Sequence, residues 1–185
     1  MAFGIGQTAG DYEFLDVLES SKSGVTYKVR NVLAERFEAL KVLPKNLQDD
    51  QERVERFLRE IKVHARLTHP NIVAFYNAGM VDRQLVMTTE LIDGMTLAQR
   101  LDSGPLPIPE ALDYIVQMLG ALDYAHGQGV VHREFTPANV MVTPEGVVKL
   151  GGFGLAKAVN DPQLTAVGTM MGSLHASLLA WSTRT

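Results

Sequence analysis

The chain has 185 residues, a net charge of −4, a pI near 5.7 and no cysteine. Hydrophobic residues make up 46% and charged residues 21%, a composition typical of a globular domain with a sizeable core. The acidic balance argues against a nucleic-acid or anionic-membrane surface, and the lack of cysteine excludes disulfides and cysteine-bound zinc. The sequence shows no leader pattern and no apolar run of ~20 residues, so we expect a cytoplasmic protein without a membrane segment.

The first half of the sequence predicts a β-rich lobe with one inserted helix. Runs rich in β-branched and aromatic residues predict strands over 12–20, 25–32 and 37–43, and further strands over 72–76 and 84–90. Between them, apolar residues at helical spacing predict a helix over 51–67, with Asp49 and Asp50 placed to cap its start. The apolar face of this helix comprises Val54, Phe57, Leu58, Ile61 and Ala65.

The second half predicts a long helix followed by two short strands. The helix spans 109–125, begins at a proline and ends before Gly127, and the strands cover 140–142 and 147–150. Its expected buried stripe comprises Leu112, Ile115, Val116, Leu119 and Leu122. We divide the chain into a tail over 1–11, a lobe over 12–93, a second lobe over 94–175 and an atypical tail over 176–185.

Four segments carry residues that could do chemistry. They are Glu38-Ala39-Leu40-Lys41, the helix residue Glu60, the run His132-Arg133-Glu134-Phe135-Thr136-Pro137-Ala138-Asn139, and the run from Lys149 to Lys157 through Gly152-Phe153-Gly154. In isolation, Lys41 fits an exposed strand lysine. Glu60 equally fits a solvated carboxylate paired with His64 one turn further on.

Taken together, these segments resemble the protein kinase domain in their order and spacing over about 120 residues. The residues around His132 and Asn139 are most similar to those of bacterial serine/threonine kinases. The resemblance implies an α+β, protein-kinase-like fold. It has an N-terminal antiparallel five-stranded sheet with one inserted helix and an incomplete, mainly helical C-terminal lobe.

The resemblance also implies roles for individual residues. Lys41 would orient the ATP phosphates and pair with Glu60, Glu134 would be the catalytic carboxylate, and Asn139 would hold Mg²⁺ weakly. His132 and Phe153 would be packing residues, and Arg133 either a surface arginine or a partner for a phosphorylated segment. The implied nucleotide site comprises Leu18, Gly24, Thr26, Ala39, Lys41, Thr89, Glu90, Leu91 and Met141.

Three departures from the family pattern argue for weak ATP and Mg²⁺ binding and for poor turnover. In the phosphate loop, Glu19 and Ser21 replace two of three glycines and only Gly24 is kept, while Lys22 offsets part of the added negative charge. Glu134 replaces an aspartate and Thr136 a lysine. Gly152 stands where the family has its metal-binding aspartate, and glycine offers no side-chain oxygen.

The sequence after residue 172 departs from the family altogether. Residues 165–172 still resemble an activation segment, whereas 176–185 match nothing recognisable. We therefore expect a truncated domain, whose tail a shifted reading frame would explain and whose second long helix keeps an uncovered apolar face. Such a face favours a protein partner, a dimer or aggregation.

Three functions fit these residues. The first is a pseudokinase-like module that binds a protein partner and holds nucleotide without turnover. The second is a slow serine/threonine kinase that uses Glu134 as base and a metal on Asn139. The third is a gene remnant without folded function. Substrate, partner and oligomeric state do not follow from the sequence.

Overall fold

The computed structural model describes residues 3–21, 24–45, 49–153 and 157–158, which fall into two compact units. The first unit comprises Met1–Thr68 and Val73–Ile92, and the second comprises His69–Ile72 and the chain from Asp93 onward. The predicted residues Lys22, 165–172 and 176–185 lie outside the described residues.

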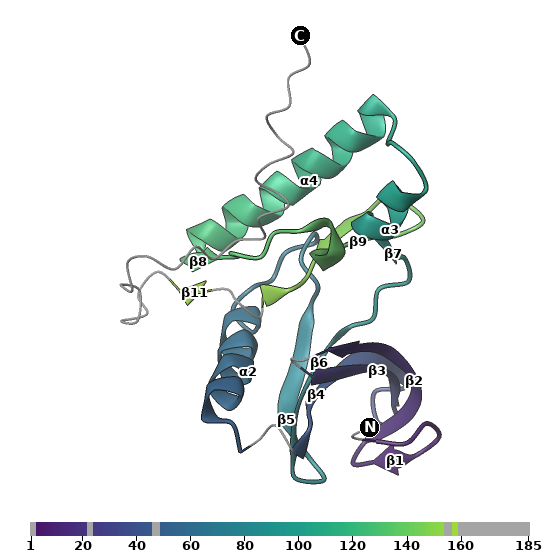
Figure 1. The fold of residues 1–185 in the computed structure, drawn as a ribbon, viewed down its shortest axis with the longest axis vertical. Helices are drawn as coiled ribbons and strands as arrows, with labels where there is room; N and C mark the ends of the chain where they lie inside the picture. Colours follow the sequence, from purple (N-terminus) through teal and green to yellow (C-terminus); the bar gives the residue numbers. More distant parts are fainter. Residues whose placement is uncertain (1–2, 22–23, 46–48, 154–156, 159–185) are drawn as a thin grey trace. The chain divides into compact units, whose positions relative to one another are not determined.

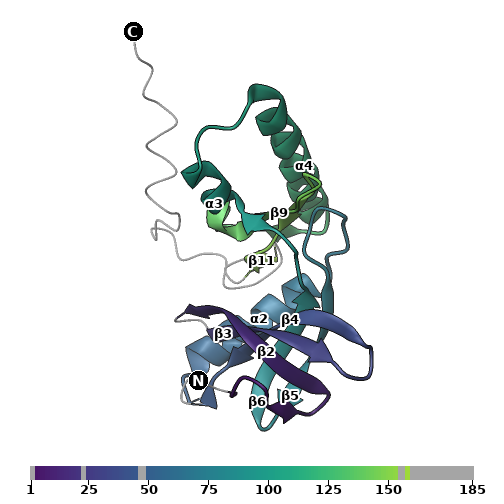
Figure 2. The ribbon, with the colours of Figure 1, turned by 90° about the vertical axis from the view of Figure 1, so that its right-hand side faces the viewer.

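The first unit is built on one antiparallel sheet with the strand order β1-β2-β3-β4-β6-β5 (Figures 1 and 2). Its strands are β1 (Thr8–Ala9), β2 (Tyr12–Ser21), β3 (Gly24–Asn31), β4 (Arg36–Leu43), β5 (Phe75–Val81) and β6 (Gln84–Glu90). The predicted strands over 12–20, 25–32, 37–43 and 84–90 are present, and β1 lies at the edge of the sheet.

The predicted strand over 72–76 is misplaced, because the sheet strand begins only at Phe75. Ile72 instead forms an isolated parallel bridge to Leu150 in the second unit. The prediction began at residue 72 because Ile72 and Val73 are β-branched and have high strand propensity. The edge strand itself contains Asn77 and Gly79, which have low strand propensity.

Helix α2 (Gln51–His64) lies beside one face of this sheet (Figures 1 and 2). The Asp50 side chain caps it by accepting a hydrogen bond from the Arg53 backbone N–H. The helix ends three residues earlier than predicted. Phe57 is buried as expected, but Leu58 and Ala65 are exposed, since the face turned to the sheet also includes Val63 and the polar residues Glu60 and His64.

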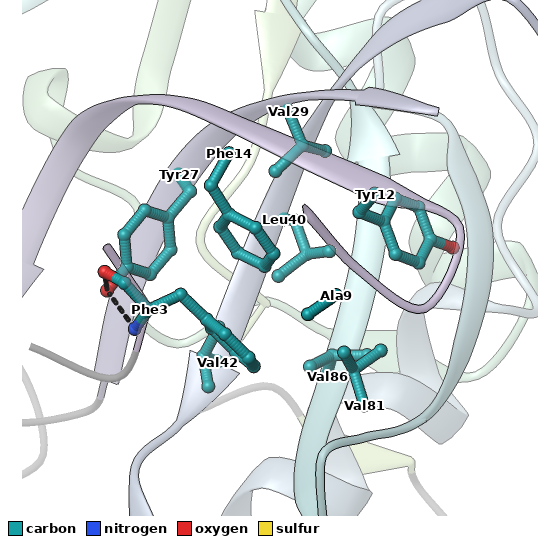
Figure 3. Close-up of a cluster of buried hydrophobic side chains, with 10 residues drawn as sticks. All are labelled: Phe3, Ala9, Tyr12, Phe14, Tyr27, Val29, Leu40, Val42, Val81 and Val86. Atoms are coloured by element: carbon teal, nitrogen blue, oxygen red, sulfur yellow. Dashed lines mark hydrogen bonds between the residues drawn. The ribbon is translucent and has the colours of Figure 1, made fainter. Parts of the chain in front are cut away.

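The opposite face of the sheet is covered by the segment before Tyr12 (Figure 3). The Phe3 ring stacks on Phe14 with the centroids 4.3 Å apart, and the Phe3 N–H donates to the Tyr27 hydroxyl at 3.2 Å. The same core includes Ala9 of β1. The residues assigned from sequence to a tail therefore supply part of the core, because Phe3 is almost fully buried.

The second unit contains two helices and several short strands. Helix α3 (Leu97–Asp102) follows β7 (Met95–Thr96), and α4 (Ile108–Gly127) precedes β8 (Val130–Val131). The 3₁₀ turn η1 (Pro137–Asn139) leads into β9 (Val140–Val142), which pairs with β10 (Val148–Leu150) and β7. A last strand, β11 (Lys157–Ala158), pairs with β8.

Helix α4 is buried on a different face from the one predicted. Its buried residues are Tyr114, Met118, Ala121 and Ala125, at helical spacing. Most of the predicted stripe is exposed: the relative accessibilities are 57% for Leu112, 45% for Ile115, 68% for Val116 and 59% for Leu119. The helix has two apolar faces, so periodicity alone could not tell which one packs. The expectation of an uncovered apolar face fits this arrangement.

Candidate nucleotide and phosphotransfer site

Lys41 of β4 and Glu60 of α2 form an ion pair inside the first unit. The Lys41 Nζ donates to both Glu60 carboxylate oxygens at 2.8 Å. The side chains are 19% and 9% exposed, so the pair is largely shielded from water. The His64 Nε2, one turn further along α2, lies 2.7 Å from the Val73 carbonyl oxygen. The structure brings together the two residues that the sequence predicted as partners.

The register of the sheet places Glu19 on the same face as Lys41. Glu19 pairs with Thr26 across β2 and β3, and Thr26 pairs with Lys41 across β3 and β4. Directly paired residues of antiparallel strands project to the same side of a sheet. An exposed carboxylate therefore stands in the same cross-strand row as the ammonium expected to meet phosphates.

Gly24, the only glycine kept from the phosphate-loop pattern, has a structural reason of its own. Its φ is +143°, and a Cβ built there would lie 2.4 Å from the Val42 carbonyl oxygen. The close approach of β3 to β4 thus requires glycine whether or not a phosphate binds. Gly24 by itself says little about nucleotide binding.

Two predicted nucleotide-site residues of the first unit, Ala39 and Thr89, lie on the same face of the sheet as Lys41. Ala39 pairs directly with Thr89 across β4 and β6, one row from Lys41. The pairing of these strands ends at Glu90, whose N–H donates to the Ala74 carbonyl oxygen, and Leu91 follows the strand. Leu18 is 47% exposed at a register shift in β2. The remaining predicted contact, Met141, belongs to β9 of the second unit.

His132 is the first residue of the loop between β8 and η1. Its Nε2 lies 2.7 Å from the Gly151 carbonyl oxygen, and its Nδ1 accepts the Glu134 backbone N–H at 3.3 Å. Both contacts require a neutral ring protonated on Nε2. Burial lowers the His132 pKa, which agrees with that form. The ring also contacts Phe153 with the centroids 4.6 Å apart, so the packing role expected for both residues fits the structure.

Asn139 ties the loop around Glu134 to the turn after β10. Its side-chain Nδ2 donates to the Glu134 carbonyl oxygen at 2.8 Å, and its own carbonyl oxygen accepts the Gly151 N–H at 2.9 Å. The Glu134 residue is exposed, whereas Thr136 is half-buried. This arrangement leaves the Glu134 carboxylate accessible to a substrate hydroxyl.

Gly152 has no side chain that could bind a metal, and a side chain at this position would have to displace the Asn139 amide. Its φ is +75°, in the left-handed region that favours glycine. A Cβ built on it would lie 2.4 Å from Cγ of Asn139 and 2.7 Å from both amide atoms. The described residues contain no group of three or more histidine, cysteine, aspartate or glutamate side chains that could hold a metal ion. Position 152 therefore supplies no side-chain ligand for the Mg²⁺ that kinase chemistry uses.

The sequence analysis did not predict the hydrogen bonds by which Asn71 and Gln117 hold the β9–β10 hairpin. Asn71 Nδ2 donates to Gln117 Oε1 at 2.8 Å and to the Val148 carbonyl oxygen at 2.9 Å, while Gln117 Oε1 also accepts the Val148 N–H. Gln117 Nε2 donates to the Gly146 carbonyl oxygen. These bonds fix the β9–β10 hairpin to α4. The sequence His69-Pro70-Asn71 follows the predicted helix over 51–67 and indicates a helix end there, but it does not indicate these hydrogen bonds.

The comparisons with known proteins agree with this fold and motif order. The protein kinase domain family model matches residues 12–174. The chain is 42% identical to a probable serine/threonine-protein kinase PknB of Lactococcus lactis, over 77% of this chain and 23% of that protein. It is 32% identical to the serine/threonine-protein kinase PrkC of Bacillus subtilis, over 90% of this chain and 26% of that protein.

Among solved structures, the PknI kinase domain of Mycobacterium tuberculosis matches with a TM-score of 0.71 and 36% identity, over 84% of this chain and 63% of that one. The chain belongs to the serine/threonine protein kinase family. It spans about a quarter of the curated relatives' length and less than two thirds of that solved kinase domain. Among the described residues, no helix is long and apolar enough to cross a membrane.

Proposed function

We propose that this chain is a binding module of the kinase family, which holds a purine nucleotide without transferring its phosphate at a useful rate. The observation that carries the proposal is Gly152. It supplies no oxygen ligand, and the Asn139 amide fills the space that a side chain at that position would need.

The loss of the metal ligand is a loss of transition-state charge stabilisation. In kinases, Mg²⁺ bridges the phosphates and neutralises charge that develops during transfer. Without a carboxylate at position 152, a metal would have to rely on the side-chain oxygen of Asn139. Thr136 adds no positive charge in place of the lysine of the family. These losses act on one transition state, so their costs do not simply add.

A slow kinase is the second candidate, and the Lys41–Glu60 pair favours it. That pair is formed with both carboxylate oxygens, and Glu134 keeps an exposed carboxylate that can accept a proton. Glutamate is one methylene longer than aspartate. A misplacement of ~1 Å in a catalytic group can reduce the rate ~100-fold.

Transfer of labelled phosphate from ATP to a generic basic protein distinguishes the two candidates. The binding-module proposal expects no transfer above the level of the Glu134→Ala variant. The slow kinase would be established instead if the wild-type chain transfers phosphate and Glu134→Ala does not. The control variant Glu145→Ala changes an exposed carboxylate outside the loop and should keep the wild-type level of transfer.

A further inference from the structure

Helix α4 exposes an apolar stripe that runs along most of its length. The stripe comprises Leu112, Ile115, Val116 and Leu119, which are exposed, and Leu122, which is half-buried. The residues through which α4 packs in the second unit lie on another face of the helix. A contiguous exposed apolar patch of roughly a few hundred Å² or more marks an interaction site in a globular protein.

The spacing of the stripe is typical of two paired helices, and it is the same in both directions. Leu112, Ile115, Leu119 and Leu122 are three, four and three positions apart. Spacings that alternate between three and four place apolar residues on the contact face of a helix pair. Because the series is the same when counted from either end, an antiparallel copy of α4 presents a matching stripe. In that register, Leu112 lies opposite Leu122 of the second copy, and Ile115 lies opposite Leu119.

Val116 lies close to the centre of this register. It is 68% exposed and follows Ile115 at the margin of the stripe. The centre falls at position 117, midway between residues 112 and 122, so the two copies of Val116 meet near a two-fold axis. A two-fold contact uses the same patch on both subunits, which is what the symmetric spacing of this stripe provides.

The charges beside the stripe favour the antiparallel direction. Asp123 is exposed near the C-terminal end of α4. In the antiparallel register it lies beside Pro109, in the first turn of the second copy, where the unpaired N–H groups make the helix end positive. A parallel pair would instead place Asp123 at the negative end of the second helix. Glu110, the acidic residue of the first turn, is paired with Arg100 at 3.3 Å, which offsets its charge.

We propose that a second copy of this chain covers the stripe, through an antiparallel pair of α4 helices related by a two-fold axis near Val116. The contact uses one face of one helix and is therefore smaller than the ~800 Å² per partner of a standard interface. The dimer is accordingly weak, with a dissociation constant on the order of 10⁻⁵ M. This inference uses only residues of the second unit and does not rest on the proposed function.

Sedimentation equilibrium of the wild-type chain from ~1 to ~200 µM tests the proposal and should show monomer and dimer in exchange. Val116→Lys should weaken dimerisation on the order of 10-fold or more, because it brings two ammonium groups together near the axis. The control Gln128→Lys adds the same charge at an exposed position just after α4 and should leave the equilibrium unchanged. A wild-type chain that stays monomeric at ~200 µM, or equal effects of the two substitutions, would overturn the proposal.

Thiol cross-linking tests the antiparallel register. The chain has no cysteine, so the thiol of a Val116→Cys variant is unique. Val116 is one residue from the centre, which puts its two copies ~3 Å apart along the helix axis, whereas the exposed Asp113 is four residues away and its copies are ~12 Å apart. A short bismaleimide should therefore cross-link Val116→Cys faster than the control Asp113→Cys.

Equal or slower cross-linking of Val116→Cys would overturn the antiparallel register. A third result would identify a different occupant of the stripe. If Val116→Cys is monomeric and its thiol reacts with a maleimide much more slowly than that of Asp113→Cys, another segment of the same chain covers the stripe, and the second copy is excluded.

Discussion

Replacing Gly152 by aspartate tests whether the metal position is closed by its surroundings as well as by its residue type. The variant restores the carboxylate that the family uses. Two features of the structure oppose it: the φ of +75° and the Asn139 amide, whose Cγ would lie 2.4 Å from the new Cβ. We expect Gly152→Asp to destabilise the chain and not to restore transfer.

The two contributions can be estimated separately. A residue other than glycine in the left-handed region costs ~1–2 kcal/mol. Moving the Asn139 side chain breaks its exposed hydrogen bond to the Glu134 carbonyl oxygen, which contributes ~0.5–1.5 kcal/mol. The expected loss of unfolding free energy is therefore ~1.5–3.5 kcal/mol, measured by urea denaturation.

Gly129 provides a matched control for the backbone term. Its φ is +71°, and a Cβ there would meet nothing within 4 Å. Gly129→Asp should therefore show the backbone cost alone. The excess cost at Gly152 should disappear in an Asn139→Ala background, which removes the colliding amide. Equal losses at the two glycines, or an excess that persists without the amide, would refute the steric explanation.

Three further predictions concern the ion pair, the buried histidine and α4. Lys41→Met should lower the unfolding free energy by ~1–3 kcal/mol in urea denaturation. The reason is that the Glu60 side chain, which is only 9% exposed, loses its ion-pair partner. An unchanged denaturation midpoint would contradict this prediction. Because the folded-state pKa of His132 is lowered, its contribution to stability is complete above pH ~6.5 and is lost as pH falls toward the folded pKa, by at most ~1.4 kcal/mol per pH unit. In urea denaturation at several pH values, His132→Phe should reduce the fall of the unfolding free energy below pH ~6.5. An unchanged pH dependence would show that His132 is not its cause. Leu119→Lys should reduce concentration-dependent light scattering more than the exposed control Gln128→Lys does, since Leu119 is 59% exposed on an apolar face; equal effects would show that this face does not associate.

The prediction from sequence was most accurate for segments that match motifs of the family. Lys41 and Glu60 were assigned as partners, and the strand over 84–90 has the predicted bounds. The buried face of α4 was wrong because both faces of that helix are apolar. Periodicity reports the spacing of apolar residues and not the element that covers them.

Features that depend on contacts between distant residues could not be predicted. Phe3 contributes to the core through Phe14 and Tyr27, and nothing in the local sequence of residues 1–11 indicates this packing. The position of Glu19 relative to Lys41 depends on a register shift in β2 between Val17 and Glu19. The loss of the metal ligand at Gly152 was visible in the sequence, but its collision with Asn139 was not.

The central claim is that this chain binds ATP but lacks the side-chain ligand that holds Mg²⁺ in kinases, because glycine stands at position 152. Thermal unfolding of the chain with ATP, in EDTA and in excess Mg²⁺, tests it most directly. A ligand at ~100 times its dissociation constant stabilises a folded protein by ~2.7 kcal/mol, which moves the midpoint by several degrees. We predict an ATP-dependent shift that Mg²⁺ does not enlarge. A shift that appears or grows substantially only with Mg²⁺ would contradict the claim and show that Asn139 and its neighbours hold a working metal.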